Sequence, residues 1–75
     1  QIRYDLPQAS NVRLQIFNAL GQLVRTLVSE EQAAGFKTIE WDGRNQSGTI
    51  SGSGIYLYRL EMDGFVKTRK MMLLK

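Results

Sequence analysis

A glycine-rich stretch between aromatic residues constrains the fold of this chain more than any other feature. Four of the seven glycines lie between Trp41 and Ile55, so this backbone suits turns better than regular packing. Trp41 precedes the loop, and Tyr56 and Tyr58 follow it. Because an aromatic side chain buries about 150–250 Å², we expect these three residues to join two layers of strands. Buried anchors are favoured over an exposed platform for stacking sugars or bases.

The segments before this stretch show the period-2 alternation of half-buried strands. Apolar and polar residues alternate at 2–6 and again at 12–16, and Pro7 ends the first run. The segment Asn18–Gly21 is then predicted to be a short hairpin connection, in which Gly21 can take a positive φ.

Two further strands are predicted before the glycine-rich stretch. Residues 22–29 also fit a helical turn, but their β-branched content and the preceding hairpin favour a strand. The polar segment 30–35 is a connection compatible with one helical turn that its glycine would end. Residues 36–41 form the next predicted strand, with Ile39 and Trp41 on one face.

The strongest hairpin signal follows the glycine-rich stretch. Asp63-Gly64 lies between the strand-like runs 55–62 and 65–74, and this dipeptide favours a two-residue type I′ turn. The register that follows pairs Tyr56 with Met71, Tyr58 with Arg69, and Leu60 with Lys67.

This register places a lysine on a face expected to belong to the core. Lys67 lies opposite Leu60 in it, and two solutions remain open. Either a bulge shifts the register, or Arg69 stacks over Tyr58 while Lys67 extends toward solvent at the rim.

Six or seven short strands separated by turn signals predict an all-β fold. The expected architecture is a small antiparallel β-sandwich in one domain spanning residues 1–75. The chain has no cysteine or histidine, so disulfides and the usual zinc or iron ligand sets are excluded. Stability must come from apolar residues, which make up 43% of the chain. The expected core includes Tyr4, Leu14, Ile16, Ile39, Trp41, Tyr56 and Leu73.

Charge and hydropathy narrow the possible partners. The net charge of +3 is mild, but no acidic residue follows Asp63, whereas four basic residues do. This basic end is interpreted first as a solvated edge that discourages strand association, and second as a surface for an anionic partner. It lacks the interleaved aromatics of a nucleic-acid site, and no apolar run approaches the roughly 20 residues that span a bilayer.

The candidate chemical sites carry little signal, and neither catalysis nor a cofactor is expected. Triads built on histidine are impossible. Asp5, Asp42 and Asp63 each lie at a turn or strand end, where aspartate is ordinarily structural. The segment 42–48 faintly resembles a calcium loop but lacks the terminal glutamate of an EF-hand. Hydrogen bonds from its Asp, Asn and Ser side chains to the loop backbone are therefore favoured over a metal.

Five motifs in sequence order resemble a known family. They are Ile2-x-Tyr4-x-Leu6-Pro7; Val12-x-Leu14-x-Ile16-Phe17-Asn18-x-x-Gly21-Gln22-x-Val24; Trp41-Asp42-Gly43-x-Asn45-x-x-Gly48; Ser53-Gly54-Ile55-Tyr56-x-Tyr58-Arg59-Leu60; and Lys70-Met71-x-Leu73-Leu74-Lys75. Over essentially the whole chain they resemble the type A C-terminal sorting domains of the type IX secretion system, although Ser53 stands where many members have proline. The Trp-Asp-Gly loop and Gly-x-Tyr strand are also similar to the immunoglobulin-like domain of flagellar hook-capping proteins, a likeness limited to the middle of the chain.

The sorting-domain resemblance implies an immunoglobulin-like or fibronectin-like fold and a role in delivery. Such a domain is the C-terminal part of a larger secreted protein, follows a cargo domain, and passes through the periplasm to the cell surface or exterior. The implied partners are an outer-membrane secretion apparatus and a sortase-like protease. The implied recognition residues are Gly54, Tyr56, Lys70, Met71, Leu73, Leu74 and Lys75.

The competing hypothesis is a structural immunoglobulin-like spacer or interaction module in a multidomain secreted enzyme. It predicts the same fold and no sorting signal. A hook-cap scaffold is a third hypothesis, and it would require disordered and helical segments on either side of the domain. A parent gene that continued well past Lys75 would weigh against sorting.

Overall fold

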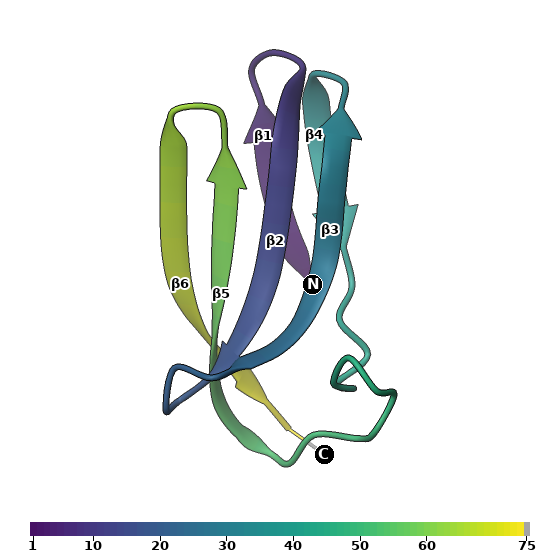
Figure 1. The fold of residues 1–75 in the computed structure, drawn as a ribbon, viewed down its shortest axis with the longest axis vertical. Coiled ribbons are helices and arrows are strands. Elements are labelled where there is room, and N and C mark those ends of the chain that lie inside the picture. The colour runs from purple at the N-terminus through teal and green to yellow at the C-terminus, as the bar shows by residue number, and fades with distance from the viewer. Residues whose placement is uncertain (75) are drawn as a thin grey trace.

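The computed structural model describes residues 1–74 and contains six β-strands (Figure 1). They are β1 (Ile2–Leu6), β2 (Ser10–Asn18), β3 (Leu23–Gln32), β4 (Gly35–Ile39), β5 (Gly54–Met62) and β6 (Phe65–Leu73). Strands β1 and β4 form a two-stranded antiparallel sheet, and the other four form an antiparallel sheet in the order β3-β2-β5-β6. The predicted all-β sandwich is confirmed.

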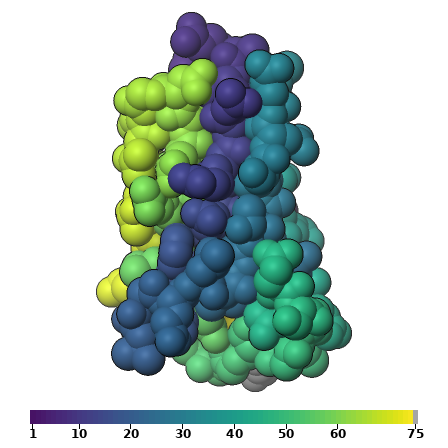
Figure 2. All heavy atoms as spheres, in the orientation of Figure 1, coloured from purple at the N-terminus to yellow at the C-terminus, as the bar shows by residue number. Residues whose placement is uncertain are grey.

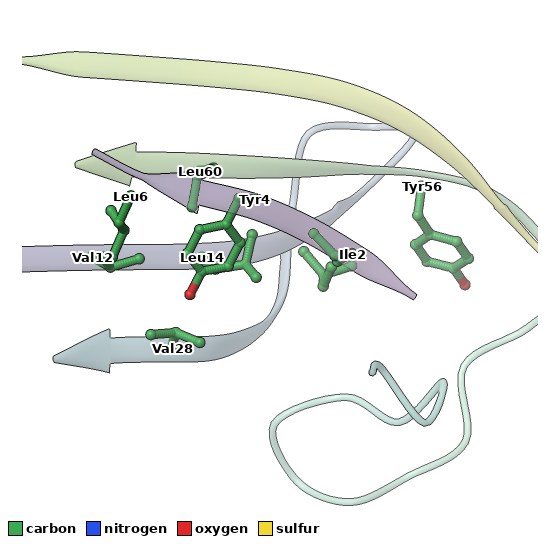
Figure 3. Close-up of a cluster of buried hydrophobic side chains, with 9 residues drawn as sticks. Ile2, Tyr4, Leu6, Val12, Leu14, Val28, Tyr56 and Leu60 are labelled. Atoms are coloured by element: carbon green, nitrogen blue, oxygen red, sulfur yellow. The ribbon is translucent and has the colours of Figure 1, made fainter. Parts of the chain in front are cut away.

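The core lies between the two sheets, where the apolar faces of their strands meet (Figure 3). Alternation selects its members, because every second side chain of β1 and β2 points inward. Its buried apolar residues are Ile2, Tyr4, Leu6, Val12, Leu14, Ile16, Val28, Tyr56 and Leu60. Of the expected core, Tyr4, Leu14, Ile16 and Tyr56 are buried, whereas Ile39, Trp41 and Leu73 are only partly buried and pack against it.

Strand pairing corrects two of the predicted boundaries. The polar connection after β3 contains no helical turn, because β3 stays paired with β2 as far as Gln32, and Gly35 then begins β4. Strand β4 stays paired with β1 only as far as Ile39. The predicted strand 36–41 is therefore too long, and Trp41 belongs to the following loop.

The β5–β6 hairpin has the predicted two-residue loop and the predicted register. Pairing runs without a shift along both strands, so the hypothesis of a bulge is wrong. The turn is not type I′, because Gly64 has a φ of 71° but Asp63 does not have a positive φ. A positive φ at the second loop residue alone is the sign pattern of a type II turn. The Asp63 amide N–H donates to Oγ of Ser10 at 2.9 Å, which ties this turn to the start of β2.

The two sheets cover each other unevenly. In Figure 1 the β1–β4 sheet lies behind β2 and β3, away from β6. Most of β6 is exposed as a result, including Lys67 and Arg69, which face the same side of the sheet as their partners Leu60 and Tyr58. Lys67 extends into solvent, as expected. Arg69 does not stack on Tyr58, because the ring contact found in residues 1–74 joins Trp41 and Tyr56.

Candidate partner-recognition surface

Four of the implied recognition residues meet where β5 begins and β6 ends. Gly54 pairs with Leu73, and Tyr56 pairs with Met71. Tyr56 is buried, and Met71 and Leu73 are partly buried against the core, so these side chains mainly stabilise the fold. Gly54 has a φ of 150°, where a Cβ would meet no atom within 4 Å. Glycine is therefore required at position 54 by the positive φ and not by lack of space for a side chain.

The other implied residues are accessible or lie outside the described chain. Lys70 pairs with Leu57 and projects from the outer face of the four-stranded sheet. Leu74 is 79% exposed just beyond β6. Lys75 falls outside residues 1–74, which the structure describes. Lys70 and Leu74 therefore offer a partner more surface than the inward-facing members do.

Tyr56 is held by the glycine-rich loop. Its ring lies edge-on to Trp41, with the centroids 5.1 Å apart. Its hydroxyl donates to the Gly52 carbonyl oxygen at 2.7 Å, and the Trp41 indole N–H donates to the Arg44 carbonyl oxygen at 2.9 Å. Both aromatic residues thus satisfy their polar atoms on the loop backbone, which closes the base of the sandwich.

Side chains of the loop also organise its own backbone. Oδ1 of Asp42 accepts hydrogen bonds from the Arg44 amide at 3.0 Å and from Nη1 of Arg25 at 2.9 Å. Oδ1 of Asn45 accepts hydrogen bonds from the amides of Ser47 and Thr49, both at 3.0 Å. The structural interpretation of Asp42 and Asn45 is confirmed. Ser47 contributes its amide rather than its hydroxyl.

The same loop covers the free edge of β3. The Gln46 amide donates to the Val24 carbonyl oxygen at 2.9 Å, and Oε1 of Gln46 accepts from the Thr26 amide at 2.9 Å. An edge strand exposes unpaired backbone groups to other strands. This glutamine occupies two of those groups on β3, a role that no local sequence signal indicated.

The outer face of the four-stranded sheet carries an apolar cluster that sequence reasoning missed. We call it the outer apolar cluster; it consists of Phe17, Leu23, Ile55, Leu57 and Met72. Pairing places Leu23 and Leu57 on either side of Phe17, and Ile55 beside Met72. Leu23, Ile55 and Met72 are 55%, 44% and 64% exposed. The face that carries the cluster is turned toward the viewer in Figure 2. Alternation could have revealed most of it, because the cluster residues of β2 and β5 occupy the positions between inward-facing ones.

Titratable side chains do not gather into a chemical site in residues 1–74. No three acidic, histidine or cysteine residues there lie close enough to hold a metal ion. The ion pairs of this region lie at the surface, such as Arg13 with Glu61 at 2.7 Å. Residues 1–74 contain no helix that is long and apolar enough to cross a membrane.

One phenol has a shifted pKa for structural reasons. Burial raises the pKa of Tyr4 above its ordinary value of 10.0, and the charge of Glu30 adds to this effect, whereas the Gln32 amide acts in the opposite direction. The Tyr4 hydroxyl donates to Oε1 of Gln32 at 2.6 Å. This bond connects β1 of one sheet to β3 of the other.

Comparison with known proteins identifies the family. The family model described as the FlgD Ig-like domain matches residues 1–64. The chain belongs to this family. The likeness to hook-capping proteins is therefore not limited to the middle of the chain, as the sequence motifs suggested, but extends from the first strand to the β5–β6 turn.

A solved structure supports the same assignment. The crystal structure of FlgD from P. aeruginosa is similar to this FlgD-family domain, with a TM-score of 0.73 and 30% sequence identity. The similarity covers 95% of this chain and 57% of that one, so the domain spans little more than half of that FlgD chain. No curated protein matches the chain.

Proposed function

We propose that this domain is a non-catalytic immunoglobulin-like module that supports and connects other parts of a larger secreted or periplasmic protein. The observation that carries the proposal is membership of the FlgD Ig-like domain family over residues 1–64. FlgD is a hook-capping protein of the flagellum, so its Ig-like domain serves in an assembly. This chain would serve in the same general way, through its surfaces.

The distribution of charged groups supports a non-catalytic role. General acid–base catalysis requires titratable groups held together in a pocket. In residues 1–74 such groups lie along exposed strand faces and in surface ion pairs such as Arg25 with Asp42. Apart from the loop at residues 40–53, the connections between strands are short, and that loop is closed by its own hydrogen bonds. This arrangement suits a rigid spacer better than a catalytic cleft.

The outer apolar cluster supports an additional role in contacts with a neighbouring domain. Apolar residues that lie together on one exposed face commonly mark an interaction surface. Leu23, Ile55 and Met72 are exposed on this face, and Lys70 lies beside Leu57 at its margin. A neighbouring domain that covered the cluster would remove this apolar area from water.

The test compares the parent protein with and without residues 1–75. Deletion should leave the specific activity of the remaining domains intact but abolish their correct assembly, measured by size and by crosslinking. Ile55→Glu should weaken the same contacts, whereas Thr68→Glu, on the outer face but away from the cluster, should not. Catalytic turnover by the purified domain, or normal assembly after its deletion, would contradict the proposal.

The exposed strand β6 favours sorting as a second candidate. It is an edge strand, and Lys67, Arg69 and Lys70 on it are exposed. An outer-membrane secretion apparatus and a sortase-like protease would be the partners, and a preceding cargo domain would be delivered to the cell surface. Deleting residues 70–75 from a cargo fusion should then trap the cargo in the periplasm of a host with type IX secretion. Normal export of the truncated fusion would reject sorting. Lys70→Gln should reduce export if charge is recognised, with folding almost unchanged.

A further inference from the structure

A polar pocket opens at the base of the sandwich, between the β2–β3 hairpin and the glycine-rich loop. Both segments lie at the lower end of the molecule in Figures 1 and 2. The volume of the pocket is about 550 Å³, and the residues that line it fall between positions 18 and 56. None of these residues carries a charge, and six of them have a side-chain amide or an aliphatic hydroxyl: Asn18, Gln22, Asn45, Gln46, Ser47 and Ser51.

Backbone amides fix the orientation of two side-chain amides on the loop wall. Oδ1 of Asn45 accepts hydrogen bonds from the amides of Ser47 and Thr49, both at 3.0 Å. Oε1 of Gln46 accepts from the Thr26 amide at 2.9 Å. Because an N–H group must face an oxygen, the remaining polar atom of each side chain is its NH₂ nitrogen. No hydrogen bond within residues 1–74 uses either NH₂ group, so both are available to a ligand.

The hairpin wall offers a third amide donor by the same logic. Oδ1 of Asn18 accepts from the amides of Leu20 at 3.0 Å and Gln22 at 2.9 Å, so its Nδ2 must be the donor of this side chain. That Nδ2 donates to Oε1 of Gln22 at 2.8 Å. The Gln22 oxygen is therefore engaged, and its NH₂ group is left for the pocket. Across both walls the fold uses the amide oxygens and leaves the N–H donors.

This arrangement suits a neutral ligand that is rich in oxygen acceptors. An anion would supply acceptors, but no lysine or arginine lines the pocket to balance its charge. A peptide is disfavoured, because it brings N–H donors together with its carbonyl groups while the amide oxygens here are already engaged. A saccharide presents many hydroxyl oxygens that accept from amide N–H groups, and the hydroxyls of Ser47 and Ser51 can donate to it or accept from it.

We propose that this pocket binds a neutral saccharide, whose oxygens accept hydrogen bonds from the NH₂ groups of Gln22, Asn45 and Gln46. Recognition would depend on amide donors rather than on aromatic stacking, because Tyr56 at the floor of the pocket is buried. Leu23 borders both this pocket and the outer apolar cluster, but the two surfaces differ in chemistry. The proposal adds a binding site to the domain and does not depend on its role as a spacer.

The probes are three neutral trisaccharides, chitotriose, cellotriose and maltotriose, each titrated into the full chain and followed by NMR. At least one of them should shift the side-chain NH₂ signals of Asn45, Gln46 and Gln22 together with the backbone amides of residues 45–52. Trigalacturonate, which carries carboxylates, should bind more weakly than the best neutral probe. Tighter binding of trigalacturonate would overturn the assignment to neutral ligands.

Amide-to-acid substitutions separate binding from folding. Asn45→Asp keeps the oxygen that accepts from the Ser47 and Thr49 amides but removes the NH₂ group. It should leave the melting temperature nearly unchanged and weaken saccharide binding by about three- to tenfold, the effect of one lost hydrogen bond. Gln46→Glu should act in the same way, because its oxygen still accepts from the Thr26 amide.

Asn11→Asp is the matched control, since it makes the same change in charge on β2 outside the pocket. It should leave the affinity unchanged. Gln22→Glu on the exposed hairpin is a further binding variant that does not alter the loop, and it should weaken binding if either loop variant loses its structure. Two results would overturn the proposal: none of the neutral trisaccharides moves the pocket signals, or the pocket variants bind as tightly as Asn11→Asp does.

Discussion

The rings of Trp41 and Tyr56 meet edge to face, with centroids 5.1 Å apart and an interplanar angle of 70°. One residue follows β4 of the small sheet, and the other lies in β5 of the large sheet. Between them in sequence is the glycine-rich loop, and each ring donates one hydrogen bond to its backbone. The aromatic pair therefore joins both sheets and the loop at one end of the sandwich.

Trp41→Ala should destabilise the domain by about 3 kcal/mol, at the low end of the range for tryptophan because Trp41 is only partly buried. Chemical denaturation would measure this loss, which is large beside the roughly 5–15 kcal/mol typical of a domain. Phe36→Ala is the control, since Phe36 is 89% exposed and its loss should change stability by less than about 0.5 kcal/mol. Equal effects of the two substitutions would contradict the anchoring role of Trp41.

Gly64→Ala should destabilise the hairpin by about 1–2 kcal/mol, because Gly64 has a φ of 71° that alanine adopts with strain. A Cβ at this position meets no atom within 4 Å, so the cost is one of backbone conformation alone. Gly52→Ala is the matched substitution, because Gly52 also has open space around it but no positive φ. It should be neutral or stabilise by about 0.4–1 kcal/mol. Thermal melts of both variants would reveal the difference, and similar losses would argue against strain at Gly64.

Stability should fall at alkaline pH partly through Tyr4. Its folded pKa is raised above 10.0 by burial, so the folded chain holds the phenol proton more tightly than the unfolded chain does. This contribution is fully present below the unfolded pKa of about 10 and is lost as the pH rises through the folded pKa.

Tyr4→Phe isolates that contribution. At neutral pH it should cost about 1 kcal/mol, through loss of the hydrogen bond to Gln32. As the pH rises above about 10, its unfolding free energy should fall less steeply than that of the unaltered chain. Parallel pH profiles for the two proteins would show that Tyr4 does not contribute to alkaline destabilisation.

Calcium should leave the melting temperature unchanged. Oδ1 of Asp42 already accepts hydrogen bonds from Arg25 and Arg44, and Oδ1 of Asn45 accepts two amide hydrogen bonds. A metal ion that bound the folded loop would stabilise it by mass action, so a rise in melting temperature with added calcium chloride would refute the structural interpretation of these side chains. Magnesium chloride at the same ionic strength is the control.

Much of the strand content could be predicted from local pattern. Burial alternates along β1 and β2 as the sequence does, with Val12, Leu14 and Ile16 all buried. The register of β5 with β6 followed from the position of Asp63-Gly64, because a two-residue loop determines which residues face each other. The turn type did not follow, since the Asp63 amide bonds to Ser10, which is distant in sequence.

The candidate surfaces depended on contacts that no local pattern contains. Alternation assigns Met71 and Lys67 to the same side of β6, yet the first packs against the core and the second faces solvent. The difference arises because packing reaches Met71 at the base of the sandwich, whereas in residues 1–74 no strand of the small sheet lies over Lys67.

The sequence by itself determined the strands, their faces and the hairpin register, because these depend on side-chain alternation and on turns of a few residues. Only the tertiary structure decided that Trp41 lies at the margin of the core and that Gln46 covers the edge of β3. Burial at these positions depends on which strand of the opposite sheet lies above them, and that is set by pairing between residues far apart in the chain.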